Sequence, residues 1–386
     1  MRARLLPSHS VAGRAFALHY PRQHRAVRVM AKVQVQEVAE GQAASPWLPR
    51  SGVCGASLPL WHAHDAIMIG GYVEQEGAEG VSRREVLDAW TFEAAGGGRW
   101  HELRFAPGPQ PTARIASQAL VLGEHLYLIA GWAPAAGPQA AFLDDVWRLD
   151  LRSATWQQLQ PQGEMLPKIS RFQAVAVGDS HILIHHHRSE AEVLVLEVSD
   201  PHCTTPTLSK LPLSGPSPSS RGLHSLTLLT PQGPQAAPSL TTAKLLLFGG
   251  APQHGPMLDD LHELDLGTRA WRQLTPAGQT PHARCSQFAA PLPGGQGVLY
   301  FGGAHYPDGQ GSGPLTVLND LFLFDQASCS WVVPELADSS TLPAARNAGL
   351  CVPLAKRPGT FLLAAGWLPF KKSFNDSFLI TLNTAT

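Results

Sequence analysis

One short pattern recurs along this chain of 386 residues. An apolar run that ends in Gly-Gly is followed by an Asp-containing apolar strand and then, a short way downstream, by a Trp. The four clearest copies occupy residues 67–103, 126–159, 245–274 and 298–331. Recurrence of this kind predicts a fold in which one supersecondary unit is repeated, each copy burying its apolar face against the next.

Each unit is expected to be a small antiparallel sheet. Its segments are short, rich in β-branched and aromatic residues, and bounded by Gly, Pro or Asn, which is typical of strands. No segment offers three helical turns between an N-cap and a C-terminal Gly. A further apolar run precedes the second strand of a unit, for example at residues 118–121, 174–177 and 226–229, so four strands fit each unit. Four-stranded sheets arranged radially protect their edges by closing a ring.

The combination of apolar-Gly-Gly, Asn-Asp-apolar, Trp and Pro-x-x-Arg resembles the kelch repeat over residues 31–386. The resemblance implies an all-β, six-bladed kelch-type β-propeller. Two copies are degenerate: one carries a His triplet at residues 185–187 in place of Gly-Gly, and the last ends without a fourth strand. Residues 31–38 alternate apolar and polar side chains, as a half-buried strand does. We therefore predict that this N-terminal strand completes the last blade and that residues 31–386 form a single domain.

The first 30 residues differ in composition from the rest. They contain six Arg and no acidic residue, the first carboxylate being Glu37. Arg-rich, acid-poor leaders are typical of organelle transit peptides, and residues 27–31 resemble a plastid-type processing site. We expect residues 1–30 to direct the protein to a plastid, with a mitochondrial transit peptide or a disordered tail on a cytoplasmic protein as the alternatives.

Charge and cysteine usage argue against several functional classes. The formal net charge is −1 and the pI is near 7, so the chain has no overall field for nucleic acid. No apolar run reaches the roughly 18 residues that a membrane span needs. The five cysteines form no CxxC pair and are odd in number, which favours neither a zinc ribbon nor a disulfide framework. We expect a monomer without cofactor or metal.

A Pro-rich stretch followed by an Arg opens each of the six units. The start of the first strand and the end of the second lie on one face of a blade, so these arginines are predicted to ring the mouth of the central opening, beside long loops. Guanidinium groups suit carboxylates and phosphates, and the resemblance implies this use, since kelch propellers that grip acidic peptides use arginines here. In the alternative, each Arg pairs with a nearby Asp or carbonyl and serves blade packing. The residues are Arg50, Arg114, Arg171, Arg221, Arg284 and Arg346.

Two histidines of the triplet, His185 and His187, are predicted to point the same way from one strand and to share this face. We expect them to line the mouth, with zinc or copper binding as the alternative. The recurrent acidic residues before the third strands are interpreted as turn caps, because they belong to different blades. They are Asp88, Asp145, Asp260, Asp320 and Asp376.

The sequence therefore favours a protein-interaction scaffold whose Arg-ringed mouth binds an acidic or phosphorylated partner segment. The alternative is a propeller enzyme that acts on a small sugar-like or oxidisable substrate, either with or without a metal. Against the alternative, the chain has only five Tyr, too few spare for a copper radical site like that of galactose oxidase, and it contains no Gly-rich phosphate loop, GxSxG or HExxH motif. A propeller by itself does not specify function.

Overall fold

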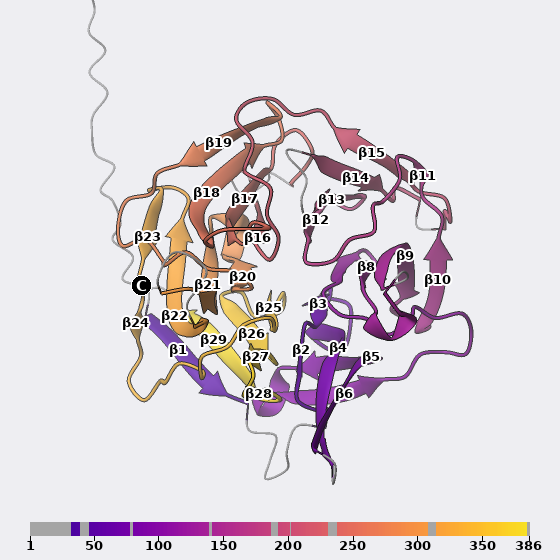
Figure 1. The fold of residues 1–386 in the computed structure, drawn as a ribbon, viewed down its shortest axis with the longest axis horizontal. Helices are drawn as coiled ribbons and strands as arrows, with labels where there is room; N and C mark the ends of the chain where they lie inside the picture. The colour runs from indigo at the N-terminus through magenta and orange to yellow at the C-terminus, as the bar shows by residue number, and fades with distance from the viewer. Residues whose placement is uncertain are drawn as a thin grey trace, which may run out of the picture.

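The computed structural model describes residues 32–38, 46–77, 80–138, 141–186, 192–200, 202–230, 238–307 and 314–383. Within these residues the chain forms six large, mainly antiparallel sheets, arranged as blades around a central channel (Figure 1), and one two-stranded hairpin. The prediction of an all-β, six-bladed kelch-type propeller is confirmed. Residues 1–30 lie outside the described part, so their targeting role stays a prediction. The helical segments described are three single 3-10 turns, η1 (Ala95–Gly97), η2 (Pro134–Ala136) and η3 (Pro293–Gly295).

The first three blades follow one another along the chain. Blade I contains β2 (Arg50–Ser51), β3 (Cys54–Ser57), β4 (Ala66–Gly77), β5 (Gly80–Glu93) and β6 (Arg99–Leu103). Blade II contains β7 (Gln118–Leu122), β8 (His125–Trp132), β9 (Phe142–Asp150) and β10 (Thr155–Leu159). Blade III contains β12 (Gln173–Val177), β13 (His181–His185), β14 (Val193–Glu197) and β15 (Thr207–Leu211), with β11 (Gln162–Gly163) parallel to β15 at its outer edge.

The remaining blades complete the circle. Blade IV contains β16 (Ser225–Leu229), β17 (Lys244–Gly250), β18 (Leu258–Asp265) and β19 (Ala270–Leu274). Blade V contains β20 (Phe288–Pro291), β21 (Gly297–His305), β22 (Thr316–Asp325) and β23 (Ser330–Val332). Blade VI contains β25 (Leu350–Pro353), β26 (Thr360–Ala364), β29 (Ser377–Asn383), β1 (Lys32–Glu37) and β24 (Glu335–Leu336), and a small hairpin of β27 (Trp367–Leu368) and β28 (Lys372–Ser373) lies between β26 and β29 in the chain.

The N-terminal strand closes the ring, as predicted. In Figure 1 the indigo β1 lies beside the yellow β29, and the two strands pair antiparallel along all six residues of β1, from Lys32 with Asn383 to Glu37 with Phe378. On its other side β1 pairs in parallel with β24. Blade VI is thus assembled from both ends of the described chain, which removes the open edge that an incomplete blade would expose.

The core is divided among the six interfaces between neighbouring blades. Six apolar clusters are present, and each joins strands of two adjacent sheets. The Trp of an outer strand packs against the preceding blade, as Trp331 of blade V does against Phe248 of blade IV, with ring centroids 5.0 Å apart. In degenerate blade III, Leu208 takes this place. In blade VI it is taken by Val33 and Val35 of β1.

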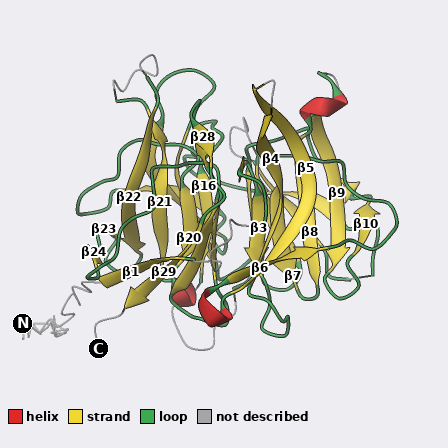
Figure 2. Ribbon diagram, turned by 90° about the horizontal axis from the view of Figure 1, so that it is seen from below, coloured by secondary structure: helices red, strands yellow, loops and turns green. Residues whose placement is uncertain are grey.

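In blades I, II, IV and V the Gly-Gly or Ala-Gly pair forms a bulge near the end of the second strand. In blade V the pairing of β21 with β22 shifts register between Phe301 and Gly303, and both glycines have positive φ, 59° at Gly302 and 99° at Gly303. A Cβ on Gly303 would lie 2.9 Å from the carbonyl oxygen of Cys285, so this position excludes a side chain. The first position tolerates alanine, which is found at Ala130 with φ of 46°. The bulges and the long β4–β5 hairpin lie on one face, called here the upper face (Figure 2).

Replacement of a buried β1 side chain should weaken closure. Val33 is fully buried in the cluster between blades V and VI, whereas its neighbour Gln34 is exposed. We expect Val33→Ala to cost about 2 kcal/mol and to lower the melting temperature by several degrees, measured by differential scanning calorimetry. The matched control Gln34→Ala should melt like the wild type. Equal melting temperatures for all three proteins, or for the wild type and a chain that lacks residues 31–40, would contradict closure by β1.

Candidate binding site at the mouth of the central channel

A closed ring of six backbone hydrogen bonds surrounds the channel on the upper face. The residue two positions before each inner strand has positive φ, between 52° and 64°. Its N–H donates to the carbonyl of the equivalent residue in the preceding blade, over N–O distances of 2.7 to 3.3 Å. The circuit is complete because Gly52 of blade I donates to Ala348 of blade VI. We call these six residues the mouth ring: Gly52, Ala116, Arg171, Leu223, Ser286 and Ala348.

Each mouth-ring residue of five blades is preceded, two positions earlier, by one of the predicted arginines. In blade II the backbone of Arg114 bonds to blade I, donating to Val86 and accepting from Gly71. Its guanidinium bonds within blade II, to the carbonyl of Ala130 and, through both terminal nitrogens, to Asp145 at 2.6 and 2.8 Å. The arginine therefore ties one blade to the next, and we call this set of contacts, made by one arginine and one aspartate, the arginine bracket.

The guanidinium contacts of this bracket recur in four other blades. Arg50 pairs with Asp88, Arg221 with Asp260, Arg284 with Asp320 and Arg346 with Asp376, in each case through two nitrogens and two oxygens. All five guanidiniums are buried, and each also donates Nε to the carbonyl two residues before it. This is the blade-packing alternative of the sequence analysis. Direct ligand binding by these five side chains stays a prediction, and here their donors are used within the chain.

The interpretation of the recurrent aspartates as turn caps was wrong. They accept guanidinium hydrogen bonds instead, and in three blades a ring N–H two residues later donates as well, from Trp90, Trp147 or His262. At Asp260 burial acts to raise the pKa, but the hydrogen bonds from Arg221 and His262 outweigh burial and hold the pKa well below its usual range. The carboxylate therefore stays ionised and neutralises the buried arginine.

Blade III lacks this bracket, and Arg171 is freed as a result. Ile169 occupies the backbone position of the other arginines, donating to Leu143 and accepting from Gly131. Arg171, which the sequence analysis placed there, lies two positions further on, in the mouth ring itself. The strand register places Glu192 where the aspartate belongs, and it pairs with Lys210 at 2.9 Å. The expectation of six equivalent arginines was therefore wrong at this one position, because the Pro-rich stretch of blade III matches the pattern two residues out of register.

Arg171 is the exposed member of the six and lines the channel. No carboxylate of the described residues forms an ion pair with it. Its charge acts across the mouth on blade V: burial raises the pKa of the Cys285 thiol to about 11, and the positive charge of Arg171 acts in the opposite direction. Because the other five arginines are each neutralised by an aspartate, the mouth ring carries the unpaired charge of this single residue.

The channel below the mouth has a volume of about 480 Å³ and is lined by the six inner strands. Polar side chains gather near its upper end, where Gln118, Gln173, Ser286 and Gln287 lie in the wall with Arg171. Gln287 donates to the carbonyl of Phe248 at 2.9 Å, and its buried Oε1 has no hydrogen-bond partner among the described residues. Further down the wall is apolar, and burial raises the pKa of the Cys54 and Cys351 thiols to about 12, which keeps them protonated.

The histidine triplet does not bring two imidazoles to the mouth in the described structure. His185 is buried between blades III and IV, with Nδ1 at 3.0 Å from Nε2 of His224 and its ring edge-on to Trp271. Burial lowers the pKa of His185 to about 3, so it is neutral. His187 lies outside the described residues. His224, which lines the channel beside Leu223, was missed by the sequence analysis because nothing but its place after the blade IV arginine marks it.

Comparison with known proteins identifies the family. The sequence model described as "Kelch motif" matches residues 113–163, and the model described as "KLHDC2/KLHL20/DRC7 Kelch-repeats domain" matches residues 198–386. Together the two matches cover more than half of the chain. The chain belongs to the kelch-repeat family.

Curated relatives of this kelch propeller include larger plant proteins. Acyl-CoA-binding domain-containing protein 4 of Arabidopsis thaliana is 28% identical over 256 residues, which cover 64% of this chain and 34% of that protein. Adagio-like protein 1 of rice is 26% identical over 271 residues, covering 65% of this chain and 40% of its own. The chain thus spans between a third and two fifths of the length of these two relatives. Among solved structures, YjhT superposes with a TM-score of 0.58 and 15% identity over 88% of this chain and 99% of its own, a likeness of fold.

The described part of this kelch propeller contains no helix with the length and apolarity needed to cross a bilayer.

Removal of one bracket carboxylate should destabilise the fold. In Asp145→Ala the buried guanidinium of Arg114 loses its counter-charge, and breaking such a pair costs about 3–5 kcal/mol. The adjacent Asp144 is exposed, so Asp144→Ala is a matched control that should change the unfolding free energy by less than about 0.5 kcal/mol. Urea unfolding followed by tryptophan fluorescence measures both. Similar values for the two variants would show that the bracket does not stabilise the propeller.

Proposed function

We propose that this kelch propeller is a protein-interaction scaffold that binds an acidic or phosphorylated segment of a partner protein at the mouth of its central channel. The kelch-propeller fold supports a protein-interaction role in general. The observation that carries the finer proposal is Arg171, an exposed cation on the mouth ring with no carboxylate partner among the described residues. Its five counterparts serve the fold, so recognition depends on one arginine rather than six.

The surroundings of Arg171 suit a peptide with an anionic side chain. A guanidinium can donate two parallel hydrogen bonds to a carboxylate or phosphate. The channel wall below is apolar, so water exclusion would strengthen the contact with the anion.

The proposal is tested with defined peptides and charge reversal. Fluorescence anisotropy is measured on the full chain with labelled ten-residue peptides that are rich in Glu or contain phosphoserine, and with Gln and Ser counterparts of the same length. A hydrogen bond to a charged group contributes about 1.5–3 kcal/mol, so Arg171→Glu should weaken binding of the acidic peptides roughly tenfold to a hundredfold. Affinity should also fall with added salt.

The matched control is Arg357→Glu. Arg357 is exposed in the loop between β25 and β26, on the face opposite the mouth, so this variant changes net charge equally but should bind like the wild type. Acidic peptides that bind no better than neutral ones, or equal weakening by the two variants, would refute recognition at the mouth. Variants of the buried arginines do not serve this test, because they are expected to unfold the protein.

A further inference from the structure

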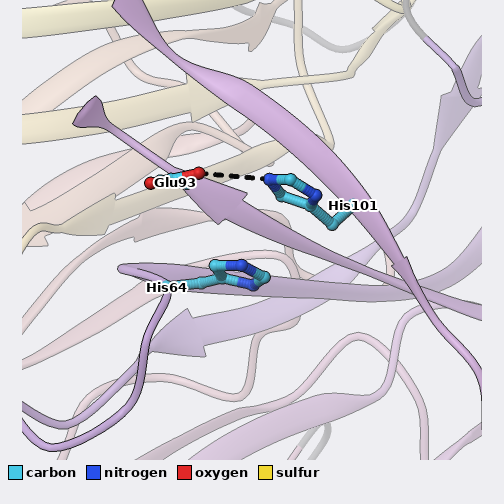
Figure 3. A group of neighbouring side chains, drawn as sticks. All are labelled: His64, Glu93 and His101. Carbon is cyan, nitrogen blue, oxygen red and sulfur yellow. Dashed lines mark hydrogen bonds and ion pairs between the residues drawn. The ribbon is translucent and has the colours of Figure 1, made fainter. Parts of the chain in front are cut away.

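Two histidines and a glutamate meet on the lower face of blade I, at the opposite end of the sheet from the mouth. His64 lies two residues before the start of β4, Glu93 ends β5, and His101 lies in β6. One possible ligand atom from each of the three lies within 4.8 Å of the other two, and all three side chains are partly exposed. Figure 3 shows the His101 ring facing the Glu93 carboxylate, with the His64 ring beneath it.

Strand register brings Glu93 and His101 together. Thr91 of β5 pairs with His101 of β6, and Glu93 pairs with Arg99. Side chains two residues apart in a strand share a face, so Glu93 and His101 are diagonal neighbours on one face of the sheet. Nε2 of His101 lies 3.3 Å from Oε2 of Glu93.

His64 is held in place by contacts from two blades. The next residue, Asp65, bonds through its N–H to the carbonyl of Phe92 and through its carboxylate to the N–H of Ala94. Lys356 of blade VI donates to the carbonyls of residues 62, 63 and 64 at 2.6, 2.9 and 3.2 Å. These polar contacts with blades I and VI therefore fix the position of the loop that carries His64.

Thr91 orients the His64 ring. The buried Thr91 hydroxyl lies 2.6 Å from Nδ1 of His64 and 3.3 Å from the carbonyl oxygen of His101. One ring nitrogen of His64 is thus held by the protein, an arrangement that leaves Nε2 for a metal.

We propose that His64, Glu93 and His101 form a zinc-binding site on the lower face of blade I. Two imidazoles and one carboxylate are a ligand set that Zn²⁺ accepts, with bonds of about 2.0–2.2 Å, and the partial exposure of the three side chains leaves a fourth position for water. The two imidazole rings now stack at 4.5 Å with an angle of 11° between them. The ring nitrogens' lone pairs lie in the planes of the rings, so two parallel rings cannot both point at one ion. Binding of Zn²⁺ by both imidazoles therefore requires the partly exposed His101 ring to tilt toward the ion.

Zinc binding is measured by equilibrium dialysis against Zn²⁺ alone, with metal quantified by mass spectrometry, on the full chain purified without a histidine tag. We expect about one Zn²⁺ per wild-type chain. His101→Ala and Glu93→Gln should each weaken binding at least tenfold through loss of a ligand. Thr91→Val, which keeps the shape of the side chain but not the hydroxyl, should weaken binding about tenfold. His254→Gln, which removes an exposed histidine on the upper face, should bind like the wild type.

Circular dichroism and melting temperature check that each variant is folded. If His101→Ala does not fold, Thr91→Val and Glu93→Gln still test the proposal. Failure of the wild-type chain to retain Zn²⁺ would overturn the proposal. Undiminished binding by folded Glu93→Gln and Thr91→Val proteins would also overturn it, because the metal would then be held elsewhere, for example by the His185–His187 run.

Discussion

The mouth ring is the constraint on which the rest of this propeller depends. Each of six residues in left-handed conformation donates a backbone hydrogen bond to the equivalent residue of the preceding blade, and the bond from Gly52 to Ala348 closes the ring. Each blade can take part only if its inner strand starts at the same height and angle, and in five of the six blades an arginine bracket sets this position. Pairing of β1 with β29 then completes blade VI toward its outer edge, so the N-terminal strand is anchored in the last blade.

This construction explains why arginines that suit anions are not free to bind them. A guanidinium at the interface of two blades needs a carboxylate beside it, since an unpaired buried charge is strongly destabilising. Our proposal therefore places recognition of an anion where a blade departs from the repeat. Blade III does so: Ile169 replaces the arginine, Glu192 replaces the aspartate, and Arg171 enters the mouth ring as an exposed cation. The departure from the consensus, rather than the consensus, marks the candidate site.

The fold could be predicted from the sequence because its signals are local and repeated. Gly-Gly, Trp and the alternation of residues 31–38 each report on one strand, and six copies fix the architecture. The site could not be predicted in the same way. The bracket position and the mouth-ring position lie only two residues apart in the sequence. Only the backbone hydrogen bonds show that Arg171 occupies the mouth-ring position. His64, Glu93 and His101 are brought together by strand pairing and by Lys356 from another blade, and no spacing in the sequence records that.

The most direct test of the account is native-state hydrogen–deuterium exchange of the mouth-ring amides, followed by mass spectrometry of the peptides that contain them. If the ring is one cooperative unit, all six amides should open with a common free energy close to that of global unfolding. A much lower opening free energy for Gly52 and Ala348 than for Ala116, Leu223 and Ser286 would contradict the account. It would show that the circle opens where blades I and VI meet while the other blades remain folded.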